Sequence, residues 1–129
     1  MKVLVADPQP SVRHALSVWI SGKIGWEVVG ESGDSSDLLK KMSQLKPELT
    51  ILDKDLPGDS TKELVAGIRQ ASKRVAVILL YYDSLEDLQV EQLMVDFFAS
   101  KVDPPARMLD TLLKAQTWLE NQEKKGLGQ

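Results

Sequence analysis

The chain has 129 residues, a usual size for one domain, and its apolar (43%) and charged (27%) fractions are ordinary for a globular protein. Its net charge of -3 provides no basic field for tracking nucleic acid, so we expect no direct nucleic-acid binding. The absence of cysteine excludes disulfides and thiolate chemistry, and no apolar run has the length of a signal peptide or a membrane span. We therefore expect a cytoplasmic protein without membrane contact.

The first half of the chain predicts two strands, each followed by a helix. Residues 3–6 are an apolar run that ends at Asp7-Pro8, and apolar residues then recur at helical spacing between positions 12 and 20. Residues 26–31 alternate in part, which favours a strand at a sheet edge. Asp34 is a candidate N-cap for a helix that ends before Pro47.

The second half continues the alternation. Residues 49–53 predict a buried strand that ends at Asp53, and the spacing of residues 60–63 is that of a capping box. Residues 75–80 predict a central strand, whereas the helix expected from Ser84 to about Leu93 has the least regular apolar pattern. Residues 95–99 predict a fifth strand. Asp103-Pro104 begins a long last helix within a domain of residues 1–122, and we expect the polar tail 123–129 to be frayed.

Regular alternation of strands and helices predicts parallel pairing, with helices on both faces of the sheet. Five such units in a chain of this size predict an α/β protein with a flavodoxin-like three-layer (βα)5 sandwich and strand order 2-1-3-4-5. In this topology the carboxyl ends of four strands meet at one crevice. They bring together Asp7, Asp53, Lys101, and either Leu80 or Tyr81.

Two carboxylates and one ammonium group at that crevice are suited to a divalent cation and a phosphoryl group. Asp53 is the candidate nucleophile, and Lys101 is the candidate group that balances the charge of the product. The alternative is a purely structural salt bridge between Lys101 and the two acids. The convergence of three strand ends favours a functional site.

This arrangement resembles the response-regulator receiver domain, the phosphoaccepting module of two-component signalling, over residues 2 to about 118. The run from Asp53 to Gly58 resembles the family signature Asp-x-x-Leu/Met-Pro-Gly, and Asp7 ends a strand like the one that carries the family's acidic pair. Lys101 follows Phe98 by three residues, the spacing of the family's lysine and switch aromatic.

The resemblance implies that Asp53 is the phosphoacceptor, that Asp7, Asp53 and Asp55 surround Mg²⁺, and that Lys101 contacts phosphate. It makes Leu80 or Tyr81, together with Phe98, the switch positions. The implied partners are a histidine kinase or phosphotransfer protein and a downstream protein. The implied output and homodimer surface is the face of the fourth helix, fifth strand and last helix.

Three departures from the family pattern weaken this expectation. Pro8 replaces the second acid of the pair and supplies neither a carboxylate nor an amide N–H, so we expect weak Mg²⁺ binding. Leu80 lacks the hydroxyl that the family places at the end of strand four, and Phe98 lacks the hydroxyl of a tyrosine. A phosphate-independent interaction module, or pseudo-receiver, is therefore the main alternative.

A phosphohydrolase is a third alternative, because Asp53 and Asp55 have the Asp-x-Asp spacing of haloacid-dehalogenase-like enzymes. Those enzymes usually carry Gly-Thr where this chain has Leu56-Pro57, and they need a later acidic motif. We therefore expect a protein that is not an enzyme.

Overall fold

The computed structural model describes residues 1–82, 84–85 and 89–127. The secondary-structure elements follow one another along the chain in this order: β1 (Lys2–Ala6), α1 (Pro10–Ile24), β2 (Glu27–Ser32), α2 (Ser35–Leu45), β3 (Leu49–Asp53), α3 (Thr61–Ala71), β4 (Ala76–Tyr81), the 3-10 turn η1 (Val90–Gln92), β5 (Phe97–Ser100) and α4 (Pro105–Leu127). The strands form one parallel sheet in the order β2-β1-β3-β4-β5. The predicted flavodoxin-like fold is confirmed.

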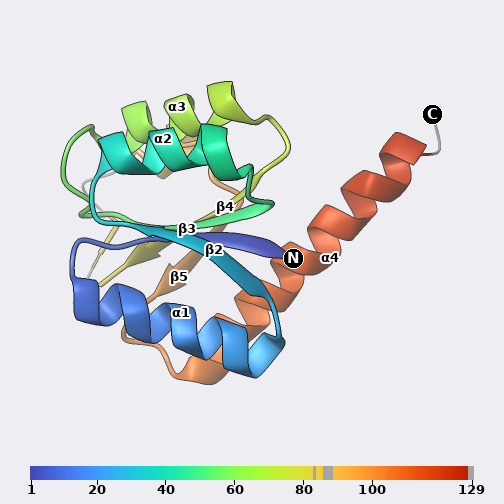
Figure 1. The fold of residues 1–129 in the computed structure, drawn as a ribbon, viewed down its shortest axis with the longest axis horizontal. Coiled ribbons are helices and arrows are strands. Elements are labelled where there is room, and N and C mark those ends of the chain that lie inside the picture. The colour runs from blue at the N-terminus through green and yellow to red at the C-terminus, as the bar shows by residue number, and fades with distance from the viewer. Residues whose placement is uncertain (83, 86–88, 128–129) are drawn as a thin grey trace.

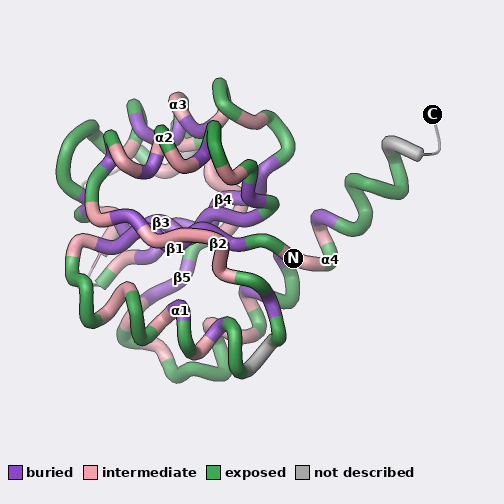
Figure 2. Tube along the Cα trace, in the orientation of Figure 1, coloured by how far each residue is buried: buried purple, intermediate pink, exposed green. Residues whose placement is uncertain are grey.

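The sheet separates two hydrophobic cores. Alternate strand residues face opposite sides, so Val5 and Ile51 lie in one core, whereas Leu4 and Leu52 lie in the other. Helices α1 and α4 complete the first core, and α2 and α3 complete the second (Figure 1). Figure 2 shows the buried central strands between outer helices with exposed outer surfaces. This three-layer packing holds the carboxyl ends of the strands at one edge of the domain.

Side-chain caps fix the starts of two helices where the sequence predicts them. Asp34 accepts a hydrogen bond from the Asp37 backbone N–H at 2.8 Å, at the beginning of α2. Ser60 accepts one from the Glu63 N–H at 3.2 Å, at the beginning of α3. Each bond satisfies a backbone donor that the first helical turn leaves unpaired.

The connection between β4 and β5 differs from the expected fourth helix. Residues 86–88 of that expectation lie outside the described residues. The described part (84–85 and 89–96), which we call the β4–β5 connection, contains only the 3-10 turn η1. Arg69 of α3 ties it to the domain, because its guanidinium group donates to the Met94 carbonyl and pairs with Asp96 at 2.7 Å.

The last helix begins at Pro105 and continues to Leu127, beyond residue 122, where we expect the domain to end. Its early residues Leu112 and Ala115 are fully buried in the first core, whereas residues 120–125 are exposed. In Figure 1 the far end of α4 extends away from the sheet. The frayed tail stays a prediction, although the helix continues into it.

The loop after β3 rests on the beginning of α2. Ser35 donates its backbone N–H to the Pro57 carbonyl at 2.9 Å, and its hydroxyl accepts the Asp59 N–H at 2.9 Å. Gly58 between them has a φ of 112°, and a Cβ at this position would overlap the Ser35 hydroxyl. This close approach requires glycine.

Gly58→Ala should therefore lower the free energy of unfolding by about 1–3 kcal/mol, through steric overlap and backbone strain. Urea denaturation measures the change. Gly22→Ala is the matched control, because Gly22 lies in α1 and a methyl group there would meet no atom of another element within 4 Å. The control should be neutral or up to about 1 kcal/mol more stable, since alanine favours helix. Equal effects of the two substitutions would contradict the close approach at Gly58.

Candidate functional site

An open cleft of about 770 Å³ lies at the carboxyl ends of β1 and β3. Asp7 directly follows β1, Asp53 is the last residue of β3, and Lys101 directly follows β5. The other residues that line the cleft are Pro8, Gln9, Val12, Leu16, Asp55, Leu80, Tyr82 and Met108. The three charged residues that the sequence predicts to converge thus lie in one cleft.

Lys101 bridges the two carboxylates. Its Nζ lies 2.5 Å from Asp7 Oδ2 and 2.5 Å from Asp53 Oδ2. The side chains of Asp7 and Asp53 are 0% and 5% exposed, and that of Lys101 is 20% exposed. Such burial leaves little water to solvate two negative charges, so the ammonium group is their principal compensation.

The remaining carboxylate oxygens accept backbone hydrogen bonds. Asp7 Oδ1 accepts the Gln9 N–H at 2.9 Å, and Asp53 Oδ1 accepts the Asp55 N–H at 2.8 Å. All four oxygens of the two carboxylates therefore have a partner within the protein. These contacts fix both side chains before any ligand arrives.

The sheet register positions these residues. Asp53 is paired with Leu80 of β4, and the Lys101 N–H donates to the Tyr81 carbonyl at 2.8 Å. The Asp7 N–H donates to the Ser32 carbonyl at 3.0 Å, at the end of β2. Backbone hydrogen bonds between neighbouring strands thus set the positions of all three charged side chains.

The pKa of Lys101 is raised above its usual value of 10.5. Burial alone would lower it, but the hydrogen bonds and charges of Asp53 and Asp7 outweigh that effect. Because the folded-state pKa exceeds the unfolded one, the stabilisation by Lys101 is fully present below pH 10.5. It is lost only as the pH rises through the folded-state pKa, so the bridge is intact across the neutral range.

The predicted switch positions separate into two places. Leu80 lines the acidic cleft, whereas Tyr81 and Phe98 line a second cavity of about 300 Å³ beside the start of α4. Tyr82 is 65% exposed yet also lines the acidic cleft. An aliphatic side chain thus lines the cleft beside Asp53, whereas the aromatic pair lines the second cavity.

The residues fit a divalent cation poorly. Among the described residues there is no group of three or more carboxylate, imidazole or thiol side chains that could hold a metal ion. Asp55 is exposed at the cleft, Pro8 supplies no carboxylate, and the Asp7 and Asp53 carboxylates already share the Lys101 ammonium group. A metal ion at this site would have to compete with that ammonium group.

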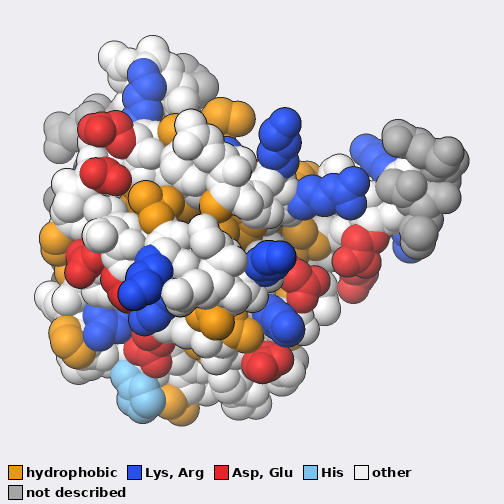
Figure 3. Space-filling model, turned by 45° about the horizontal axis from the view of Figure 1, so that its top comes forward, with side chains coloured by type: hydrophobic (Ala, Val, Ile, Leu, Met, Phe, Trp, Pro, Cys, Tyr) orange, Lys and Arg blue, Asp and Glu red, His pale blue; other side chains and the backbone are white. Residues whose placement is uncertain are grey.

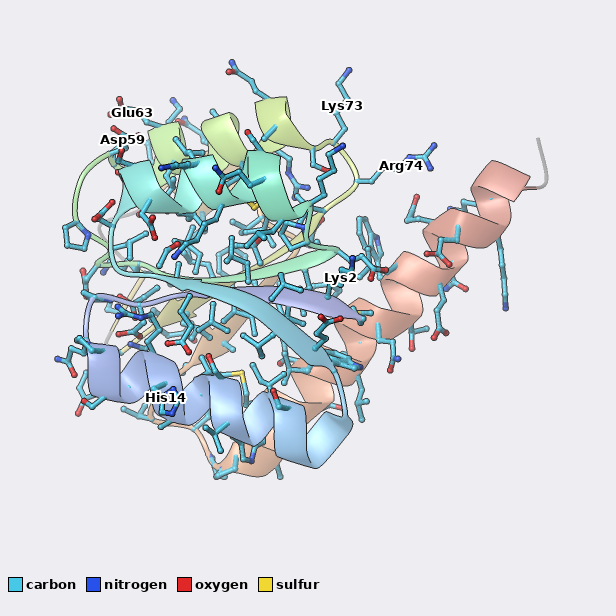
Figure 4. All side chains as sticks on the ribbon, viewed as in Figure 1. Lys2, His14, Asp59, Glu63, Lys73 and Arg74 are labelled. Carbon is cyan, nitrogen blue, oxygen red and sulfur yellow. The ribbon has the colours of Figure 1, made fainter. Side chains whose placement is uncertain are left out.

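Arg13 supports the site and was not predicted. Its Nη1 donates to the Asp7 carbonyl at 2.8 Å, and its Nε lies 3.4 Å from Glu31 Oε1. His14 is exposed on α1, with Nδ1 3.5 Å from Glu31 Oε2 (Figure 4). Arg13 acts through a backbone carbonyl, which no sequence motif encodes.

Lys54 is a second unpredicted contact residue beside the site. Its N–H donates to the Leu80 carbonyl at 2.8 Å, and its Nζ donates to the Ser84 carbonyl at 2.7 Å. Its own carbonyl accepts the Thr61 hydroxyl at 3.2 Å. One residue thus joins the ends of β3 and β4 to the β4–β5 connection and to α3.

Acidic and basic side chains are interspersed on the face shown in Figure 3, with no large area of a single charge. No helix within the described ranges is both long and apolar enough to cross a membrane.

Comparison with known proteins relates this geometry to one family. The family described as response regulator receiver domain matches residues 3–102. Transcriptional regulatory protein BtsR of Escherichia coli K12 is 26% identical over 114 residues, which cover 88% of this chain and 47% of BtsR. Response regulator protein VraR of Staphylococcus epidermidis is 27% identical over 117 residues, which cover 88% of this chain and 56% of VraR. The chain spans about half the length of these curated relatives.

Solved structures show the same fold. The REC domain of AraT from Geobacillus stearothermophilus has a TM-score of 0.83 at 22% identity, covering 95% of this chain and 97% of that one. RcsB from Salmonella enterica serovar Typhimurium, bound to the promoter rprA in the presence of the phosphomimetic BeF3-, has a TM-score of 0.79 at 25% identity. That match covers 90% of this chain and 98% of that one. BtsR, VraR and AraT are described as regulators.

Proposed function

Because the chain belongs to the response regulator receiver domain family, we propose that it serves two-component signalling by accepting a phosphoryl group on Asp53. The observation that carries this proposal is the contact of Lys101 Nζ with Asp7 and Asp53, each at 2.5 Å. It provides a carboxylate nucleophile and a cation in one open cleft.

The proposed donor is a phosphohistidine of a histidine kinase or phosphotransfer protein. A carboxylate oxygen of Asp53 attacks phosphorus, and the new P–O bond forms as the P–N bond breaks. The electron pair of that bond stays on the imidazole nitrogen, which takes up a proton from water. The product is an acyl phosphate on Asp53, and Lys101 balances its additional negative charge.

The proposed output surface consists of the β4–β5 connection, β5 and α4, which takes the place of the family's face of fourth helix, fifth strand and last helix. Phe98 and Leu113 are exposed apolar residues on its two regular elements. We propose that it contacts a downstream protein or a second copy of the chain, in the cytoplasm, without direct contact to nucleic acid.

Receiver domains generally bind Mg²⁺ at their acidic site, and we propose that this chain binds it only weakly. Asp7, Asp53 and Asp55 are the residues that would surround the metal ion. Two of these carboxylates are occupied by Lys101, and Pro8 replaces a third ligand. Hard cations gain affinity from each added carboxylate oxygen, so the loss of one acid weakens the site.

Pro8→Asp should accordingly tighten Mg²⁺ binding on the order of tenfold, because it restores a carboxylate beside Asp7. Isothermal titration calorimetry measures the dissociation constant. Pro10→Asp is the matched control, since it adds the same charge at an exposed position that does not line the cleft. If both variants gain the same Mg²⁺ affinity, the gain comes from the added negative charge alone, and the assignment of position 8 as a metal ligand is wrong.

Labelling with phosphoramidate, a small donor with a P–N bond, tests the phosphoacceptor. Intact mass spectrometry should find one acid-labile phosphoryl group on the wild-type chain and none on Asp53→Asn. Asp59→Asn is the matched control from the same loop, because Asp59 is exposed and does not line the cleft, and it should keep the label. Labelling that survives in Asp53→Asn would refute the assignment.

A phosphate-independent interaction module is the second candidate. The observation that favours it is the apolar Leu80 beside Asp53, together with an ammonium group that already bridges the two carboxylates. Under this alternative the wild-type chain stays unlabelled with both phosphoramidate and a phosphorylated kinase. We propose no enzymatic turnover for either candidate, and release of phosphate from a generic ester would contradict this.

A further inference from the structure

Asp7 is held at each of its polar groups, and one of the holding residues lies outside the cleft. Its N–H donates to the last carbonyl of β2 at 3.0 Å, and its carboxylate accepts from Gln9 and Lys101. Its carbonyl accepts from Arg13 Nη1 at 2.8 Å. This last contact is important because of Pro8. The peptide group between Asp7 and Pro8 has no N–H, so its carbonyl is its sole hydrogen-bonding group.

Resting on the proposed function, we propose that Arg13 is a positioning residue for phosphoryl transfer, because it orients the peptide group that joins Asp7 to α1. Arg13 does not line the cleft, so it acts on the reaction through Asp7 and not on the reacting atoms. Asp7 shares the Lys101 ammonium group with Asp53. A shift of Asp7 therefore changes how that cation is divided between the two carboxylates, and with it the compensation of the charge that develops at Asp53.

The surroundings of Arg13 fix its guanidinium group. Arg13 lies near the beginning of α1, where its backbone N–H donates to the Gln9 carbonyl at 2.9 Å. Its side chain is mostly buried, and its Nε lies 3.4 Å from Glu31 Oε1 of β2. Gly33 follows β2, and a Cβ at this position would lie 2.9 Å from Arg13 Nη1. Glycine at position 33 thus leaves the space beside the guanidinium group, which joins the ends of β1 and β2 to α1.

Gly33 offers a way to displace the guanidinium group without removing it. The methyl group of Gly33→Ala would meet Arg13 Nη1, the far end of a flexible side chain that can adopt another rotamer. Gly33 has no positive φ, so its backbone accepts alanine. This substitution therefore moves the side chain of Arg13 at little cost in stability.

The test is the rate of labelling by phosphoramidate at one fixed Mg²⁺ concentration, under conditions where circular dichroism shows every variant folded. In this reaction a carboxylate oxygen of Asp53 bonds to phosphorus as the P–N bond breaks, and the protonated nitrogen leaves as ammonia. Arg13→Met should lower the maximal rate about tenfold, because the orientation of the charged groups is lost. The half-saturating concentration of phosphoramidate should change little, since Arg13 does not line the cleft.

Lys41→Met is the matched control. Lys41 of α2 donates to the Glu31 carbonyl, so it makes the same kind of contact at the end of the neighbouring strand, without contact to Asp7. Its removal should leave the maximal rate within about twofold of the wild type. A loss as large as that of Arg13→Met would show that the rate follows the general stability of the strand ends, and would overturn the role of Arg13.

A double-mutant cycle tests whether Gly33 acts through Arg13. Gly33→Ala alone should lower the maximal rate about threefold, with an unfolding midpoint in urea close to that of the wild type. In the double variant Arg13→Met/Gly33→Ala there is no guanidinium group to displace, so the rate should equal that of Arg13→Met. Independent effects would instead multiply to a loss of about thirtyfold, and would contradict the inference.

The NMR signal of the Lys101 ammonium group in the unliganded protein measures the positioning without phosphoryl transfer. It should move in Arg13→Met and in Gly33→Ala, and it should keep its wild-type position in Lys41→Met. An unmoved signal in Arg13→Met would overturn the inference and leave the proposed function intact. A wild-type chain that takes up no label would overturn the proposed function, and with it the role of Arg13 in the reaction.

Discussion

Replacing Lys101 by methionine should lower the free energy of unfolding by about 3–5 kcal/mol at neutral pH, the usual cost of removing one partner of a buried ion pair. The substitution leaves Asp7 and Asp53, 0% and 5% exposed, without their shared cation. The cost should shrink as the pH rises through the raised folded-state pKa of Lys101, because the wild-type side chain then loses its charge as well. Urea denaturation at neutral and at alkaline pH measures both effects.

Lys114→Met is the matched control for this experiment. Lys114 pairs with Asp110 at 3.0 Å on α4, but both side chains are more than 60% exposed. Exposed pairs contribute only about 0–1 kcal/mol, so this variant should stay close to the wild type at every pH. If Lys101→Met loses as little unfolding free energy as Lys114→Met, the bridge in the cleft is solvated and stabilises the protein no more than an exposed ion pair does.

Replacing Arg69 by methionine should cost about 3 kcal/mol or more, since a mostly buried charge then lacks its partner. Arg69 and Asp96 are 13% and 18% exposed, and Asp96 Oδ2 also accepts the Val77 N–H at 2.7 Å. The guanidinium group donates further to the carbonyls of Met94 and Val75. Thermal or urea unfolding measures the loss.

Arg107→Met removes the same kind of side chain from an exposed position, where the nearest Asp103 oxygen is 4.0 Å away. It should change stability by less than about 1 kcal/mol. A similarly small loss in Arg69→Met would mean that the β4–β5 connection is held by its apolar contacts alone.

The five strands were predictable because buried parallel strands are short apolar runs bounded by turn residues. The run 49–53 coincides with β3, and Asp34 and Ser60 cap α2 and α3 as their positions indicate. The structure of residues 89–96 was not predictable in this way. Arg69, a residue of α3, contacts Met94 and Asp96 through space, and such tertiary contacts leave no local periodicity.

At the site, too, residues with a local sequence signal were predicted, and residues that act through tertiary contacts were not. Asp7, Asp53 and Lys101 were found because their types and strand-end positions carry the chemistry, and the topology brings strand ends together. Arg13 and Lys54 were missed because they act on backbone carbonyls, which every residue has. The sequence left open whether Leu80 or Tyr81 is the switch position, because the two alignments differ by one residue; in the structure Leu80 lines the acidic cleft and Tyr81 lines the second cavity.

Because α4 is long, a small change in its orientation at the sheet displaces its far end. Its first turns pack against the sheet beside the cavity of Tyr81 and Phe98, whereas its last turns lie away from the sheet in Figure 1. From Met108 to Leu127 the helix axis spans about 28 Å at 1.5 Å per residue. A rigid tilt of about 5° about Met108 would displace the far end by about 2.5 Å. It would also require repacking of Leu112, Ala115 and Leu119 in the first core, so the length of α4 links its far end to the packing beside β5.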